Sequence, residues 1–149
     1  MYKIEKTKFN GLYVYHPQVF EDERGYFFES YNANVWKEEG VTTQFIQDNE
    51  SQSKYGTVRG LHYQIPPHGQ SKLVRVISGQ VIDVVVDLRK NEETYGLHYS
   101  IILSQDNKKQ LHIPRGFAHG FATLSETAVF NYKCDNFYHK DSELSLIHI

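Results

Sequence analysis

The sequence has little of the features that mark secreted, membrane-spanning or nucleic-acid-binding chains. Its single cysteine cannot form an internal disulfide, which suits a reducing, cytoplasmic compartment. The formal net charge is only −2 at pH 7, so the chain has no general attraction for nucleic acid or for an acidic membrane surface. The most apolar strand-like run, 81–86, is interrupted by Asp83 and is too short to span a bilayer. We therefore expect neither a nucleic-acid partner nor a membrane partner.

The residue types that are abundant favour β-structure. Aromatic residues make up 14% of the 149 residues, and β-branched residues recur in short runs separated by Gly, Asn and Ser. A helical pattern is limited to 34–39, where Asn32 is a candidate cap and Gly40 a candidate stop. The predicted strands are 12–15, 25–30, 45–50, 58–64, 72–78, 80–88, 98–103, 110–113, 120–123 and 128–134. Many short strands without crossover helices predict one domain, 1–149, that is a sandwich, jelly roll or barrel.

Two predicted strands carry polar residues in unusual positions. Lys72 shares a strand face with Val74 and Val76, where a charged side chain is uncommon. In the strand 58–64, alternation places Gly60, His62 and Gln64 on one face, which we expect to line a cavity, and Arg59, Leu61 and Tyr63 on the other. Taken alone, a strand histidine is equally consistent with a hydrogen-bonded structural residue, and Arg59 with a solvated charge.

Five motifs, in order along the chain, resemble those of the dTDP-4-dehydrorhamnose 3,5-epimerase family. The segment PRGFAHGF at 114–121 resembles the second conserved element of the cupin superfamily, and the other segments are DERGYFFE at 22–29, QDNES at 47–51, VRGLHYQ at 58–64 and NYK at 131–133. The resemblance covers about residues 7–143. It implies an all-β, cupin-like jelly-roll barrel with one or two short helices, which acts on a dTDP-4-keto-6-deoxysugar in deoxysugar supply for surface polysaccharide, without a cofactor or a metal.

The resemblance also implies roles for individual residues. The ketone of such a sugar acidifies the protons on both neighbouring carbons, so inversion needs a base, enolate stabilisation and an acid on the opposite face. His62 matches the family's base, Lys72 the group that holds the ketone oxygen, and Tyr132 the acid, although Tyr132 alone reads more simply as a packed aromatic residue. The implied substrate-binding positions are Arg24, Glu29, Gln47, Asp48, Asn49, Arg59, His119, Tyr138 and Glu143.

Two further expectations concern neighbouring chain segments and subunits. Family members continue past the position of Glu143 into a tail with an acidic partner for the base, which this sequence lacks, so we expect the fold to persist with activity in question. Asp83 is a candidate replacement for that carboxylate, and a structural hydrogen bond is the simpler interpretation for it. The resemblance implies a homodimer in which Arg24 and Glu29 complete the neighbouring subunit's site.

Three other functions stay open at this point. A single-centre epimerase would invert carbon 3 or carbon 5 alone, and a catalytically weak relative would bind sugar nucleotides without turnover. A metal-dependent cupin is disfavoured by the sequence His62-Tyr63-Gln64, because such proteins place two histidines one residue apart, with a carboxylate a few residues later. Only His62 and His119, with His68 in a loop, would remain as ligands.

Overall fold

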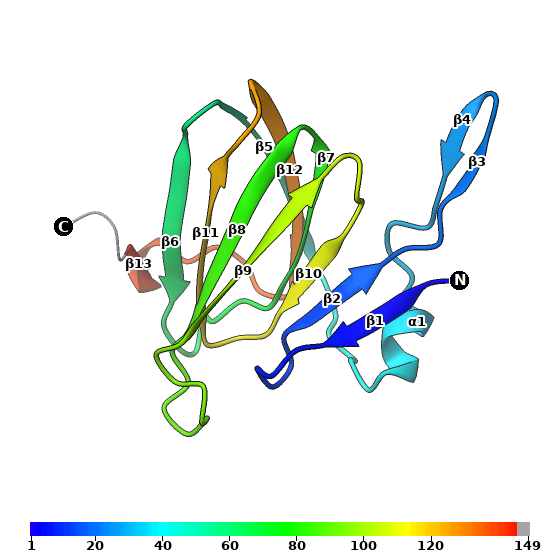
Figure 1. The fold of residues 1–149 in the computed structure, drawn as a ribbon. Coiled ribbons are helices and arrows are strands. Elements are labelled where there is room, and N and C mark those ends of the chain that lie inside the picture. Colours follow the sequence, from blue (N-terminus) through cyan, green and yellow to red (C-terminus); the bar gives the residue numbers. More distant parts are fainter. Residues whose placement is uncertain (146–149) are drawn as a thin grey trace.

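Residues 1–145, which the computed structural model describes, form two antiparallel β-sheets that face each other (Figure 1). Within this range, the larger sheet has the strand order β1 (Lys3–Lys6), β2 (Tyr13–His16), β10 (Gln110–Ile113), β7 (Lys72–Ser78), β12 (Thr127–Cys134) and β5 (Gln47–Lys54). The smaller sheet has the order β13 (Glu143–Ser145), β6 (Val58–Gln64), β11 (Phe117–Thr123), β8 (Gln80–Asp87) and β9 (His98–Ser104). This arrangement is a cupin-like jelly roll, so the predicted fold class is confirmed.

A hairpin of β3 (Phe20–Asp22) and β4 (Gly25–Phe27) projects away from the two sheets (Figure 1). Sequence patterning predicts neither β1 nor β3, because both are mostly charged and exposed and lack the apolar residues that mark a strand. The apolar run at the end of the sequence contributes β13, which pairs with β6, and its remaining residues 146–149 lie outside the described residues.

The short helix α1 (Ala33–Glu38) covers the outer face of the larger sheet. Asn32 caps it, because its side chain accepts a hydrogen bond from the backbone N–H of Asn34, and Gly40 follows with a φ of +82°. The helix buries Trp36 against Tyr15 and Leu73, which point outward from β2 and β7. The predicted helix is therefore confirmed, one residue earlier than expected. Among the described residues, no helix is both long and apolar enough to cross a membrane.

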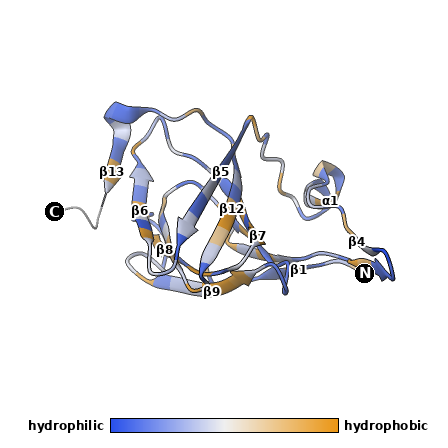
Figure 2. Cartoon of the chain, turned by 90° about the horizontal axis from the view of Figure 1, so that it is seen from above, coloured by the Kyte–Doolittle hydropathy of each residue, from blue (hydrophilic) through white to orange (hydrophobic). Residues whose placement is uncertain are grey.

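The main hydrophobic core lies between the two sheets, on the side where β2 and β10 of the larger sheet face β9 of the smaller one. Its largest fully buried side chains include Phe9, Leu111, Leu103 and Phe130. By contrast, β5 contains no hydrophobic residue, and Figure 2 shows it as hydrophilic along its length. An entirely polar edge strand is stable here because its inward face borders a cavity rather than the core.

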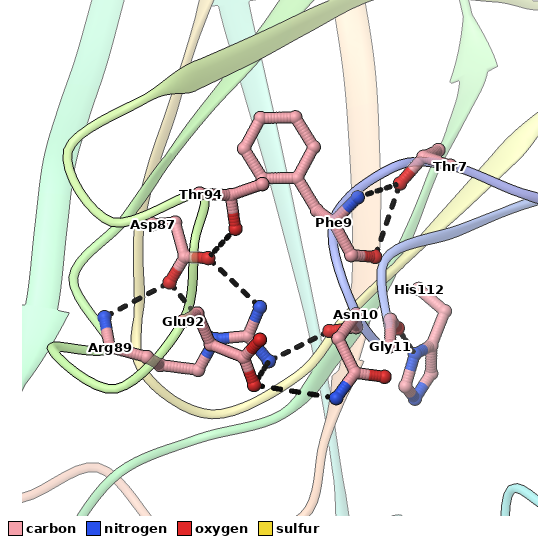
Figure 3. A network of polar contacts seen from close by, with 9 residues as sticks. All are labelled: Thr7, Phe9, Asn10, Gly11, Asp87, Arg89, Glu92, Thr94 and His112. Atoms are coloured by element: carbon pink, nitrogen blue, oxygen red, sulfur yellow. Dashed lines mark hydrogen bonds and ion pairs between the residues drawn. The ribbon is translucent and has the colours of Figure 1, made fainter.

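A buried carboxylate joins the loop after β8 to the N-terminal loop (Figure 3). Asp87, fully buried, accepts hydrogen bonds from the side chains of Arg89 and Thr94. Arg89 also donates to the backbone carbonyl of Asn10 at 2.7 Å, and its guanidinium lies 4.6 Å from the ring centroid of Phe117. Burial raises the pKa of Asp87, but the hydrogen bonds from Arg89 and Thr94 outweigh burial and lower it overall. The ionised Asp87 carboxylate thus holds Arg89 where it joins the loop after β8 to the N-terminal loop and packs on Phe117, the first residue of β11.

Candidate active site

A cavity of about 620 Å³ opens between the two sheets, beside the hydrophobic core. Strands β6 and β11 of the smaller sheet and strands β5, β7 and β12 of the larger sheet supply its walls, and the segment 138–143 supplies part of its rim. Of the residues singled out from the sequence, those that line it are Gln47, Asn49, Arg59, His62, Lys72, His119, Tyr132, Tyr138 and Glu143. The volume is in the range that suits a small organic ligand.

A β-bulge in β6 decides which residues of that strand face the cavity. His62 pairs with His119 and Arg59 with Phe121, so three steps along β6 match two along β11. The extra residue interrupts the alternation, which puts Arg59 on the cavity side together with His62. The expectation that Arg59 points away from the cavity is therefore wrong, because its side chain reaches Ser53 on β5 across it, and Tyr63 also borders the cavity.

Gly60 makes this bulge sterically feasible. Its φ is +106°, and a Cβ atom placed on it would lie 2.5 Å from the carbonyl oxygen of His119 and 2.7 Å from the Cα of Gly120. No other residue type fits between these two strand backbones without displacing one of them. The glycine thus sets the register that places His62 directly opposite His119.

A carboxylate at the rim of the cavity lies beside His62. Oε1 of Glu143 lies 3.1 Å from Nδ1 of His62, and Oε2 of Glu143 accepts a hydrogen bond from the Tyr138 hydroxyl at 2.5 Å. The hydrogen bond to Glu143 raises the pKa of Tyr138. A carboxylate this close to Nδ1 favours a proton on that nitrogen, and in this tautomer the basic lone pair of the imidazole is on Nε2.

The second histidine of the cavity has its own carboxylate on β8. Nε2 of His119 lies 2.8 Å from Oδ2 of Asp83, and both side chains are buried. His119 also stacks on Phe130, with ring centroids 6.0 Å apart. Asp83 is therefore the partner of His119, and the suggestion that it replaces a missing partner of His62 is wrong. The carboxylate that lies beside His62 is that of Glu143, on β13.

Lys72 is the charged residue on the otherwise apolar face of β7, and it is tolerated there because its side chain points into the cavity. Its Nζ lies 5.4 Å from the ring centroid of Tyr132. Burial lowers the pKa of Lys72, and the negative charges of Asp83 and Glu143 partly counter this effect. The ammonium is poorly screened at this depth, so it interacts strongly with any negative charge that forms beside it.

Tyr132 enters the cavity from β12, the neighbour of β7. Burial raises its pKa, while a hydrogen bond with the Asn49 side chain opposes the rise. Asn49 also accepts a hydrogen bond from Nε2 of Gln47 at 3.0 Å. These two amides on β5 fix the phenol, which remains protonated at neutral pH and can donate that proton.

Three residues singled out from the sequence lie away from this cavity. The Arg24 side chain is 87% exposed at the tip of the β3–β4 hairpin, where it pairs with Asp22. Glu29 accepts a hydrogen bond from the Asn32 side chain, and Asp48 pairs with Lys133 at 3.0 Å. Asp48 alternates with Gln47 and Asn49 on β5, so it points away from the cavity they line.

Sequence reasoning does not single out the apolar part of the cavity. Phe117, Phe121 and Phe130 line it beside Gln70 and Ser51. Phe117 and Phe121 alternate with His119 on one face of β11, and this period of two is the signal that could have found them. Apolar rings around a few convergent polar groups are typical of a site that binds an organic substrate.

The side chains of the cavity define an acid–base site. Among residues 1–145, no group of three or more His, Cys, Asp or Glu side chains is placed to hold a metal ion. Next to a carbonyl group, an imidazole beside a carboxylate can remove a proton from carbon, and a buried ammonium can stabilise the enolate that results. A protonated phenol can then return a proton to the carbon. The fold and the site together define a cupin-like protein equipped for proton transfer at carbon.

Comparisons with known proteins identify the family. Residues 6–148 match the model of the family described as dTDP-4-dehydrorhamnose 3,5-epimerase. The Shigella flexneri dTDP-4-dehydrorhamnose 3,5-epimerase is 49% identical over 145 residues, which cover 97% of this chain and 80% of that protein. The chain belongs to the dTDP-4-dehydrorhamnose 3,5-epimerase family.

Solved structures agree with this assignment. The Bacillus anthracis dTDP-4-dehydrorhamnose 3,5-epimerase with bound TDP and PPi is 44% identical, with a TM-score of 0.96 over 99% of this chain and 85% of that one. The Legionella pneumophila dTDP-6-deoxy-D-glucose-3,5-epimerase, in complex with dTDP-4-keto-L-rhamnose, is 45% identical, with a TM-score of 0.94 over 100% of this chain and 79% of that one.

Proposed function

We propose that the chain inverts carbons 3 and 5 of dTDP-4-dehydro-6-deoxyglucose to give dTDP-4-dehydro-L-rhamnose, in dTDP-rhamnose biosynthesis. The observation that carries this proposal is the placement of a candidate base and a candidate acid on facing sheets. His62 enters the cavity from β6, whereas Lys72 and Tyr132 enter it from β7 and β12. Family membership supports the same reaction, because the family's relatives are 3,5-epimerases by name.

The proposed chemistry moves protons only. His62 takes a proton from the carbon next to the C4 ketone, and the electron pair of that C–H bond moves into an enolate whose oxygen lies against the Lys72 ammonium. Tyr132 then gives its proton to the same carbon from the opposite face, and the ketone re-forms with the centre inverted. Proton exchange with water restores neutral His62 and the Tyr132 phenol. The second carbon reacts in the same way, and no electron acceptor is needed.

Arg59 is the proposed contact for the diphosphate. Its Nε donates to the Ser53 hydroxyl at 2.8 Å, and one terminal nitrogen donates to the Gln52 carbonyl at 3.3 Å. These bonds to β5 hold the guanidinium at the cavity wall, where a planar fork binds phosphate oxygens well. Three other residues are proposed substrate contacts because they also line the cavity: Gln47, Asn49 and His119.

The proposal includes a homodimer in the cytoplasm, in which the β3–β4 hairpin reaches the partner's cavity. The hairpin exposes Phe20, Tyr26 and Phe27 to 56%, 54% and 67%, respectively. Aromatic side chains this exposed are typical of a surface that a partner covers. Arg24 at the tip is then available to bind the diphosphate in the neighbouring subunit, with Glu29 close behind it. The compartment is inferred from the free, buried Cys134 thiol.

The reaction is tested by NMR with dTDP-4-keto-6-deoxyglucose in deuterated water. Deuterium is expected to enter at carbons 3 and 5, and His62→Ala is expected to stop its entry at both. His98→Ala is the matched control, because His98 is an exposed histidine on β9 and should leave exchange unchanged. Entry at one carbon alone means a single-centre epimerase. Binding without exchange at either carbon refutes catalysis by this chain.

Subunit mixing tests the exchange of Arg24. Arg24→Ala and His62→Ala subunits are inactive alone, but a mixed dimer contains one intact site if Arg24 acts in the neighbouring subunit. Random mixing of equal amounts should therefore restore about a quarter of the unmutated activity. No recovery, with mixed dimers demonstrated by native mass spectrometry, contradicts this arrangement.

A further inference from the structure

Two stacked histidines connect loops that flank the cavity. The rings of His68, in the loop after β6, and His139, before the 3₁₀ turn η1 (Lys140–Ser142), are parallel within 5°, with centroids 3.6 Å apart. The buried hydroxyl of Ser142 lies 2.8 Å from Nδ1 of His139 and 2.9 Å from Nδ1 of His68. A hydroxyl has one proton, so at least one of these Nδ1 atoms must carry its own. The three side chains form one hydrogen-bonded unit, which we call the histidine latch.

The Gln64 side chain fastens the same two loops to β6. Its Nε2 donates to the carbonyl oxygen of His68, and its Oε1 accepts a hydrogen bond from the backbone N–H of His139 at 2.9 Å. Gln64 is 6% exposed and lies two residues after His62 on the same strand. The histidine latch is thus anchored directly to the strand that carries the proposed base.

The segment that the histidine latch holds carries two cavity residues, Tyr138 and Glu143. Tyr138 is 55% exposed and Phe137 is 63% exposed, so burial in a core does little to fix this segment. Hydrogen bonds must therefore fix it, and these are the pairing of β13 with β6 and the side-chain contacts of the histidine latch. Glu143 follows Ser142 directly and places its carboxylate 3.1 Å from Nδ1 of His62. A small shift of the Ser142 backbone would be passed to this contact.

We propose that His68, His139 and Ser142 are positioning residues for the epimerase site. The histidine latch keeps the segment 137–143 against β6, so that the Glu143 carboxylate stays 3.1 Å from Nδ1 of His62 and favours the tautomer that carries its proton there. None of the three side chains belongs to the cavity lining. They act on the reaction through Glu143 and Tyr138. The inference rests on the proposed function, since it names what orients that function's base.

The direct test compares the kinetics of two latch variants with those of a serine-to-alanine variant outside the cavity. Ser142→Ala removes the bridging hydroxyl and adds no bulk, and His139→Phe keeps a stacked ring but removes Nδ1. Each is expected to lower kcat on the order of tenfold with a smaller change in KM, because misplacing a catalytic contact by a fraction of an ångström is costly. Ser125→Ala is the matched control, because the Ser125 hydroxyl also joins two backbone segments but lies outside the cavity. Unchanged kcat in both latch variants overturns the proposal.

A double-mutant cycle asks whether the histidine latch acts through Glu143. In a Glu143→Ala background, Ser142→Ala is expected to lower kcat less than twofold further, because the side chain that reaches His62 is already removed. Losses that multiply fully would mean that Ser142 acts elsewhere, which overturns the inference.

The tautomer of His62, read from its ¹⁵N shifts by NMR, gives a result independent of turnover. Ser142→Ala should reduce the fraction with the proton on Nδ1, while Ser125→Ala should not. If the unmutated chain shows no deuterium exchange, the proposed function fails, and a tautomer change in Ser142→Ala still supports positioning. A tautomer population that Ser142→Ala leaves unchanged contradicts positioning, whatever the exchange rate.

Discussion

Gly60→Ala should destabilise the protein well beyond the usual cost of replacing a glycine of positive φ. The added Cβ would lie 2.5 Å from the His119 carbonyl oxygen and 2.7 Å from the Gly120 Cα. Both are backbone atoms of β11, so neither can rotate away. The left-handed backbone alone costs a residue with a Cβ about 1–2 kcal/mol. Forcing the two strands apart adds about 1–3 kcal/mol. The expected loss of unfolding free energy is therefore about 2–5 kcal/mol.

Gly56→Ala separates these two contributions. Gly56 lies in the turn between β5 and β6 with a φ of +79°, and a Cβ there meets nothing within 4 Å. It should cost only the backbone component, about 1–2 kcal/mol. Both variants are compared with the unmutated chain by urea unfolding followed by circular dichroism, at one protein concentration. A Gly60→Ala loss no larger than the Gly56→Ala loss would refute the claim that close approach of β6 and β11 demands glycine.

Three further predictions concern buried ionisable groups. Burial lowers the pKa of His112, so below about pH 6.5 the unfolded chain takes up a proton that the folded chain does not bind. Stability should fall as the pH drops from 7.5 to 5.5, and His112→Phe should reduce this fall in urea midpoints; an equal fall in both proteins contradicts the assignment. Asp87→Asn should cost about 3 kcal/mol at pH 7 in the same unfolding assay, because it leaves the Arg89 charge without its carboxylate; a loss below about 1 kcal/mol would show the pair to be dispensable. Burial lowers the pKa of Lys72, so its ammonium should lose its proton at a pH below the ordinary lysine value of about 10.4. The rate of deuterium exchange should therefore begin to fall, as the pH is raised, before that value is reached. A rate that stays level up to about pH 10 argues against a charged Lys72 in the reaction.

The parts of the fold that depend on local signals could be predicted from the sequence. Helix α1 was predictable because Asn32 and Gly40 act within one turn of it, through a side-chain hydrogen bond and a positive φ. Lys72 was predictable as a cavity residue because a charged side chain on an apolar strand face is costly to bury unless it borders a polar cavity.

The remaining parts depend on contacts between distant segments. Arg59 reaches the cavity through a bulge that is defined by the pairing of β6 with β11, and strict alternation within one strand cannot reveal it. Asp83 pairs with His119 because β8 and β11 are neighbours in the smaller sheet. The residues around Asp83 in the sequence do not indicate that the two strands are neighbours. Glu143 becomes the partner of His62 for the same reason, through the pairing of β13 with β6.

The strand order of the larger sheet has a consequence for how the site comes into being during folding. The strand that carries Lys72, β7, lies between β10 and β12, and both of these follow it at long sequence separation. Closing such long loops is entropically costly, and chains dominated by non-local pairing fold slowly. The cavity also has walls from β11 and β12, so it cannot form before these later strands have paired. A nascent chain made only as far as β7 therefore has Lys72 and His62 but lacks the walls of the pocket that β11 and β12 supply.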